Sequence, residues 1–189
     1  MKYVLYIYLT LVGLASCNKT TTAPAEHVEK TEYKEKLIRD GWTEENISSG
    51  ELTEQYGYKP VYGIQDNYFD VTMGEGADIA LKIVDVKTNQ CIRYAYVKEN
   101  STITLSQIPQ VQYYLKLAYG KDWMEIETDS ATLGKFTRGA FYERSSEVYD
   151  FGTKNSRKEI NYELKINVRD ASGMNNFETR PISEEEFMK

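Results

Sequence analysis

Histidine is almost absent from this chain, which holds a single one, His27. It lies just past a small polar stretch, where neither a catalytic triad nor a zinc site is expected to assemble. The sequence therefore argues against histidine-dependent hydrolases and histidine-rich metal sites. We predict no catalytic residues, no metal site and no cofactor.

Cysteine is nearly as scarce, with Cys17 and Cys91 alone. If Cys17 is modified, Cys91 has no partner for an intrachain disulfide. Cys91 begins a predicted strand with no histidine nearby, so we expect a small, half-buried apolar side chain rather than a reactive thiol.

Basic residues are outnumbered, with 23 Lys and Arg against 29 Asp and Glu and a net charge of −6. This balance excludes nucleic acid as a partner, because binding to phosphates needs a clustered basic face. The composition does not change abruptly along the chain and shows no repeats. It therefore predicts one folded domain, over residues 42–189.

Only one long apolar run is present, Tyr3 to Leu14. As a helix it would span roughly 18 Å, short of the ~30 Å hydrocarbon core, so residues 1–16 are predicted to be a signal peptide. The segment Leu14-Ala15-Ser16-Cys17 that follows resembles the lipobox of bacterial lipoproteins. That resemblance implies lipidation of Cys17, whose acyl chains would anchor the protein in a lipid bilayer. The alternative is a cleaved secretory signal with a chance cysteine.

Residues 17–41 are predicted to hold the lipid anchor, a polar tether and a short helix. The tether covers 18–26, and residues 26–40 favour a helix that ends at Gly41. Asn18 and Lys19 stand where some lipoproteins carry an acidic surface-export tag. We therefore expect a location in the bacterial cell envelope, on the periplasmic side of the outer membrane.

Four consecutive strands are predicted between Gly76 and Trp123. In the first, the apolar series changes phase at Val84, which indicates a bulge near Ile83 and Val84 or burial on both faces. The fourth strand alternates regularly, with Leu115 on the predicted buried side and Lys116 on the other, and it is expected to end at Gly120. Residues 124–128 are expected to finish a strand.

Weaker patterns complete the predicted fold. We expect an edge strand at 68–72, a loop at 129–138, a strand pair within 141–151 and a strand at 160–168. The capping-box spacing of Ser183 and Glu186 before Phe187 fits either one helical turn or a disordered end. The predicted fold class is mainly β, an antiparallel β-sandwich with a short N-terminal helix.

The segment 102–120 resembles prealbumin-like β-sandwiches such as carboxypeptidase regulatory-like domains. Ile108, Pro109 and Tyr113 match that family's motif, and Val111 stands where the family has glycine. The chain also resembles uncharacterised bacterial lipoproteins of similar size. The resemblance implies an accessory or binding module.

Candidate site residues come from the tyrosines and from one acidic segment. Tyr56, Tyr58 and Tyr62 lie in a loop with Gly and Pro and are candidates for a binding surface, although tyrosine also packs well in sheet proteins. The segment from Asp66 to Asp70 resembles part of a calcium loop but lacks its glycine and distal glutamate, so we interpret these as turn residues.

Together these features predict a membrane-anchored bacterial lipoprotein that acts as a non-enzymatic binding or envelope-interaction module. Its expected partners are the lipid bilayer, through acylated Cys17, and an envelope protein or glycan. Two alternatives stay open: a glycan-binding accessory protein that uses the loop tyrosines, and a glycan-cleaving enzyme. The enzyme would need only two carboxylates ~5 to 9 Å apart.

The first testable prediction concerns the anchor. Cys17→Ala should no longer fractionate with membranes, because no other apolar segment of the sequence is long enough to anchor the chain. Detergent-phase partitioning of the mutant and wild-type proteins checks this, and equal recovery in the detergent phase would contradict it.

Overall fold

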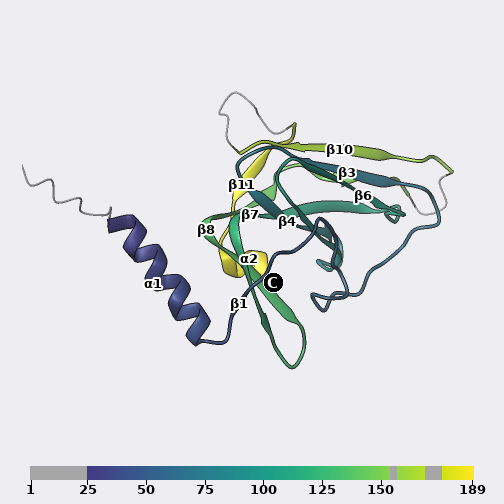
Figure 1. Ribbon diagram of the computed structural model, residues 1–189. Coiled ribbons are helices and arrows are strands. Elements are labelled where there is room, and N and C mark those ends of the chain that lie inside the picture. Colours follow the sequence, from purple (N-terminus) through teal and green to yellow (C-terminus); the bar gives the residue numbers. More distant parts are fainter. Residues whose placement is uncertain (1–24, 154–156, 169–175) are drawn as a thin grey trace, which may run out of the picture.

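The computed structural model describes residues 25–153, 157–168 and 176–189, and it is mainly β. Two sheets pack face to face as a sandwich, with the small sheet above the large one in Figure 1. The large sheet has the order β11 (Thr179–Pro181), β8 (Thr132–Ser145), β7 (Gln112–Glu127), β4 (Asp78–Asp85), β5 (Cys91–Val97) and β2 (Gly50–Glu51). The short strands β1 (Thr43–Glu44) and β9 (Tyr149–Asp150) also pair with β7. The small sheet has the order β10 (Asn161–Ile166), β3 (Tyr68–Met73) and β6 (Ser101–Ser106). The predicted fold class is confirmed.

The main core lies between the two sheets. Fully buried side chains of β3, such as Phe69 and Val71, meet those of β4 and β7, such as Leu81 and Leu115. Alternation along each strand explains this layer, since every second side chain points to the same face. The four strands predicted between Gly76 and Trp123 are β4 to β7.

A second core covers the opposite, outer face of the large sheet. Its buried side chains are Tyr56, Ala80, Tyr94, Tyr96, Ala118, Trp123, Phe136 and Phe187. The covering segments are the stretch 47–58 and the C-terminal helix α2 (Glu184–Met188). The central strands are therefore buried on both faces, and β4 also has the expected irregularity between Ile83 and Val84.

Burial on both faces overturns the expectation for Lys116. Its side chain is only 6% exposed, and its Nζ donates to the carbonyl oxygen of Glu186 in α2 at 2.5 Å. Strict alternation indicates which side chains share a face, but it cannot show that the second face is also covered.

The long hairpin of β7 and β8 was the main misprediction. β7 does not end at Gly120, because a register shift between Tyr119 and Lys121 lets the strand continue to Glu127. A Cβ at Gly120 would lie 2.5 Å from the Cβ of Phe136, so glycine is required for the close approach of the two strands. Residues 129–138 are mostly strand β8 rather than loop, since a tight turn closed by Thr128 and Ala131 reverses the chain.

The small sheet also differs from expectation in one respect. The strands predicted at 68–72 and 160–168 are present as β3 and β10. However, β3 is the central strand and not an edge, because β6 pairs with it antiparallel and β10 pairs with it parallel. Local sequence carries no signal for a partner more than 90 residues away.

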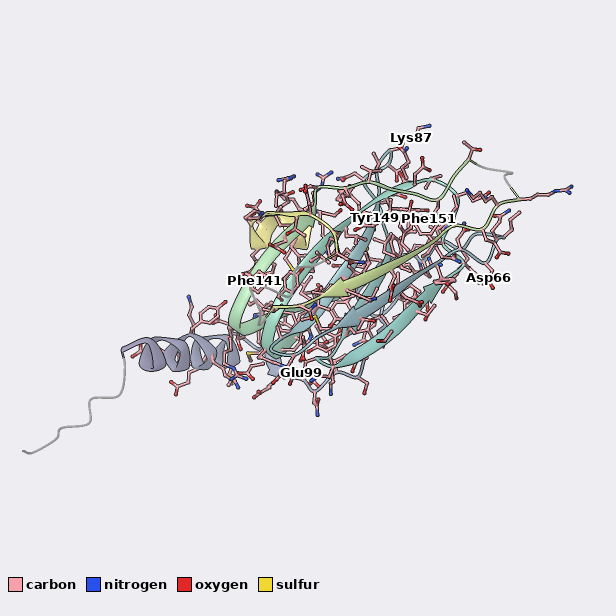
Figure 2. All side chains as sticks on the ribbon, turned by 90° about the horizontal axis from the view of Figure 1, so that it is seen from above. Asp66, Lys87, Glu99, Phe141, Tyr149 and Phe151 are labelled. Carbon is pink, nitrogen blue, oxygen red and sulfur yellow. The ribbon has the colours of Figure 1, made fainter. Side chains whose placement is uncertain are left out.

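The helices agree with the sequence more closely. α1 (Ala25–Arg39) projects at the end of the molecule where Phe141 lies, with Asp66 at the opposite end (Figure 2). Leu37 is buried, and the Nζ of Lys135 lies 4.8 Å from the ring centre of Trp42 just beyond the helix. In α2 the side chain of Ser183 accepts from the backbone N–H of Glu186 and Phe187 is 1% exposed, so the helical turn was the correct alternative.

The second testable prediction uses the position of Lys116. Lys116→Ala should lower the free energy of unfolding by about 1 to 3 kcal/mol, because it leaves the Glu186 carbonyl without its donor under α2. Lys87→Ala, at an exposed turn position, should change it by less than about 0.5 kcal/mol. Denaturant melts of the two variants give the comparison. Equal midpoints would mean that the Lys116 side chain is solvated.

Candidate functional site

The three candidate tyrosines do not form one surface. Tyr56 is 5% exposed, and its ring stacks on Tyr94 with centres 4.4 Å apart. Its hydroxyl donates to the carboxylate of Glu125 and accepts from the indole N–H of Trp123. Burial, together with the hydrogen bond to Glu125, raises the pKa of Tyr56 well above its usual value. The binding role expected for Tyr56 is wrong, because its position is that of a core residue.

Tyr58 is half-buried and has a different environment. Its ring stacks against the ring of Tyr94, with the two ring centres 5.8 Å apart. The Nζ of Lys82 lies 4.9 Å from the ring centre of Tyr58. Tyr58 therefore helps to cover a buried cation and offers little surface to a ligand.

Tyr62 alone keeps the exposure that a binding residue needs, with 57% of its surface accessible. The guanidinium carbon of Arg93 lies 3.9 Å from the centre of the Tyr62 ring, as a cation–π contact. Arg93 is completely buried and comes from β5, so the exposed ring rests on a rigid part of the sheet.

Arg93 is itself held by three groups. One of its Nη atoms donates to the carbonyl oxygens of Val61 and Ile92, and its Nε lies 3.3 Å from a carboxylate oxygen of Glu51 in β2. The other Nη atom has no hydrogen-bond partner among the described residues. Burial lowers the pKa of Arg93, while the nearby Glu51 opposes that shift. The network fixes the loop that carries Tyr62 against the edge of the sheet.

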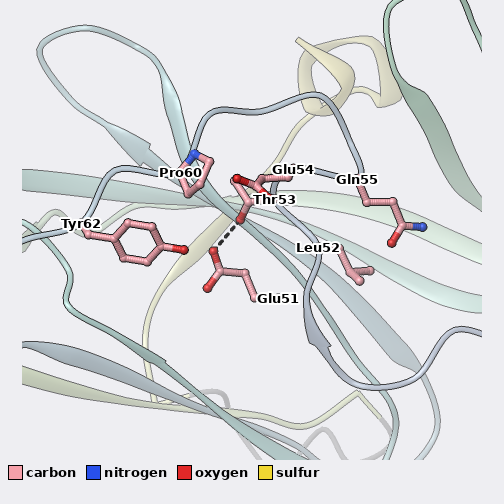
Figure 3. A pocket seen from close by; sticks show the side chains of 7 residues that line it. All are labelled: Glu51, Leu52, Thr53, Glu54, Gln55, Pro60 and Tyr62. Atoms are coloured by element: carbon pink, nitrogen blue, oxygen red, sulfur yellow. Dashed lines mark hydrogen bonds between the residues drawn. The ribbon is translucent and has the colours of Figure 1, made fainter.

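A pocket of about 380 Å³ lies beside Tyr62, shown in Figure 3. Its lining residues are Glu51, Leu52, Thr53, Glu54, Gln55, Pro60 and Tyr62. The hydroxyl of Thr53 donates to Glu51 at 2.8 Å and accepts from the backbone N–H of Tyr94, which ties the pocket wall to β5. The volume lies at the lower end of the range of small-molecule sites. We call this feature the Tyr62 pocket.

The pocket offers one aromatic face, a proline and several polar groups. The carboxylates of Glu51 and Glu54 can accept hydrogen bonds, and the amide of Gln55 can donate and accept. Such a lining suits an uncharged polar ligand with several hydroxyl groups, since the carboxylates would repel an anion.

The remaining candidates take structural positions. The thiol of half-buried Cys91 donates to the carbonyl oxygen of Arg93, and burial raises its pKa to about 12, as expected for an unreactive cysteine. Asn67 is buried with its amide between Ile108 and Ile160, and Asp70 accepts from Thr104. The residues that the structure describes hold no cluster of three or more His, Cys, Asp or Glu that could bind a metal.

Some predictions lie outside the described residues. These include Cys17, the signal peptide at 1–16 and the tether at 18–24, and the side chain of His27 is likewise not described. Within the described part of the chain, none of the helices is both long and apolar enough to span a bilayer.

Sequence reasoning missed Arg93 and Glu51, which organise the site. A signal was present, since Arg93 interrupts the apolar strand Cys91–Val97 at a position where an unpaired charge would be costly. The spacing of residues in the sequence could not identify Glu51 as its partner, because the pairing of β2 with β5 is what brings the two residues together.

Comparison with known proteins finds no relative. No family model matches the chain, and neither a curated protein nor a solved structure matches it significantly. The resemblance of 102–120 to prealbumin-like domains therefore stays a prediction. In that segment the hydroxyl of Tyr113 donates to the carbonyl oxygen of Pro109 at 3.1 Å and closes the turn before β7.

The third testable prediction separates packing from surface tyrosines. Tyr56→Ala should cost about 3 to 5 kcal/mol, because it empties a core position and removes one of the two side-chain donors to the carboxylate of Glu125, the other being Trp123. Tyr62→Ala should cost about 1 kcal/mol or less, the scale of one exposed cation–π contact. Thermal melts of the two variants check this order, and a larger loss for Tyr62→Ala would show that its ring is part of the core.

Proposed function

We propose that this protein is a lipid-anchored, non-enzymatic binding module of the bacterial cell envelope, with the Tyr62 pocket as its ligand site. The observation that carries the proposal is the exposed Tyr62 ring held against the buried Arg93 guanidinium. An aromatic ring that is both accessible and immobilised binds a ligand at low cost in conformational entropy. The lipobox-like segment ending at Cys17 supports the anchor and the envelope location.

The lining of the pocket favours a glycan as the ligand. A sugar ring can place its C–H face on Tyr62 while its hydroxyls donate to the carboxylates of Glu51 and Glu54. A broad platform of three coplanar tyrosines does not form, because Tyr56 is buried. The pocket therefore suits one or two sugar units rather than the side of a long polymer.

The glycan-cleaving alternative receives less support from the geometry. Glu51 is already engaged by Arg93 and by the hydroxyl of Thr53. A carboxylate held by two internal donors is poorly placed to deliver a proton to a leaving group.

One further observation supports a protein partner as a second candidate. Val61 and Ile64, which flank Tyr62 in sequence, are 43% and 90% exposed. Neighbouring exposed apolar side chains of this size are typical of interaction surfaces. The envelope-interaction function thus stays a second candidate for the same loop.

The fourth testable prediction distinguishes these ligands. Neutral mono- and disaccharides, titrated into the full-length protein, should shift the backbone NMR signals of Glu51, Thr53 and Tyr62. Tyr62→Ala should weaken this binding at least about tenfold, because it removes the stacking face.

Two control variants complete the experiment. Tyr33→Ala, at a tyrosine in α1 that is 41% exposed, should leave saccharide binding unchanged. Ile64→Ser should also leave it unchanged if the ligand occupies the pocket. The absence of saccharide binding to wild-type protein would overturn the glycan assignment, and a loss with Ile64→Ser would favour the apolar loop.

A further inference from the structure

Four basic residues form a row across the outer face of the large sheet. Lys82 of β4 is directly opposite Lys116 of β7, which is opposite Arg144 of β8, which is opposite Arg180 of β11. Directly opposite residues on antiparallel strands have their Cβ atoms about 5 Å apart, and like charges in these positions destabilise a sheet. We call these residues the basic row.

The two lysines of the row are buried without a carboxylate. Lys82 is 2% exposed and Lys116 is 6% exposed. Among the described residues, no Asp or Glu forms an ion pair with either Nζ. Within the part of the chain that the structure describes, exposed Arg180 is the only member of the row with an ion pair, since its Nη2 lies 3.7 Å from the carboxylate of Glu186.

Backbone carbonyls of α2 take the place of an anion. The Nζ of Lys82 donates to the carbonyl oxygens of Phe187 at 2.6 Å and Met188 at 3.3 Å, and the Nζ of Lys116 donates to that of Glu186 at 2.5 Å. These three consecutive carbonyls belong to the C-terminal end of α2, where helix carbonyls lack partners within the helix. The ring of Phe187 also lies over Lys82, 4.7 Å from its Nζ.

This compensation is incomplete. A helix C-terminus carries at most about −0.5 of a charge, and the Glu186 carboxylate, which acts on Lys116, is shared with Arg180, against two positive charges in the buried part of the row. Burial lowers the pKa of Lys82 to about 8, with Lys116 adding to the shift. Burial also lowers the pKa of Lys116, although the nearby charge of Glu186 opposes that shift. A phosphate group carries about −1.5 to −2 near neutral pH and presents three acceptor oxygens, so it would balance the row better.

The cap itself is weakly held. α2 has five residues, too few for a helix to be stable alone. Of these residues Phe187 alone is buried, and Ser183 caps the helix. The ion pairs of Glu184 with Lys135 and of Glu186 with Arg180 involve exposed carboxylates and add little stability. The hydrogen bonds that the α2 carbonyls accept from Lys82 and Lys116 can therefore be replaced by hydrogen bonds to a stronger acceptor.

We propose that α2 is a displaceable cap over an anion-binding site, and that a phosphate group, free or carried on a sugar, replaces the α2 carbonyls on the basic row. The guanidinium of Arg144 is positioned to take part, since it stacks on Tyr114 at 3.7 Å beside Lys116. This site shares no lining residue with the Tyr62 pocket, so it does not depend on the function proposed above.

The experiment uses Phe187→Ala in the full-length protein to loosen the cap. Inorganic phosphate and glucose 6-phosphate are titrated calorimetrically at constant ionic strength. Removing the energetic cost of displacing α2 should tighten phosphate binding at least about tenfold over wild type. Adding Lys116→Met should abolish that gain, and adding Lys87→Met, at an exposed turn outside the row, should leave it intact.

Each outcome decides the proposal. It is overturned if Phe187→Ala binds phosphate no more tightly than wild type, or if Lys116→Met leaves the affinity unchanged. Tighter binding of glucose 6-phosphate than of phosphate assigns the group to a sugar, and equal affinities assign it to the free anion.

A second measurement covers a variant that fails to fold. In wild-type protein, saturating phosphate should speed amide hydrogen exchange at Phe187 and Lys189, whose N–H groups bond within the cap. Exchange in β7 should stay constant. Unchanged exchange at both cap amides would also overturn the proposal.

Discussion

Burial of the large sheet on both faces is the constraint on which the rest of this structure depends. The small sheet covers one face, and the stretch 47–58 with α2 covers the other. Any charged side chain on the central strands must then find its partner inside the protein, because leaving it unpaired is costly. Lys82 and Lys116 find theirs in the carbonyls of α2, and Arg93 finds its own in Glu51 and two backbone carbonyls.

The same constraint explains how a loop residue becomes part of a rigid site. Tyr62 lies outside any strand, yet its ring rests on a buried guanidinium that is held by two backbone carbonyls and by the partly exposed carboxylate of Glu51. Because the side chain of Glu51 is 30% exposed, its ion pair with Arg93 is expected to contribute little net stability. The pair is thus better understood as fixing the conformation of the loop than as a source of net stability.

Sequence patterns predicted what depends on neighbours along the chain and missed what depends on distant partners. Strands β4 to β7, the irregularity at Ile83 and Val84, and the Ser183 cap all follow from local spacing. Lys116 was assigned to solvent because alternation cannot reveal a second buried face. Tyr56 was assigned to a surface because its loop is polar, while its partner Glu125 lies 69 residues further on. The sequence predicts a loop for the first half of β8, up to residue 138, because its glycine and charges hide a strand that exists through pairing with β7.

Tyr94 is the residue at which the two sites meet. Its backbone N–H donates to Thr53 in the wall of the Tyr62 pocket, while its ring lies 5.9 Å from the Nζ of Lys82 under the cap. The sites nevertheless differ in charge, with carboxylates lining the first and cations the second. A single small ligand is therefore unsuited to both. Because the backbone of β5 is paired on both sides near Tyr94, a rearrangement of α2 would have to act through side chains of the outer core, chiefly the rings of Tyr94 and Tyr58. Displacing α2 and occupying the Tyr62 pocket are thus expected to be largely independent events, which is why variants of each site can be read separately.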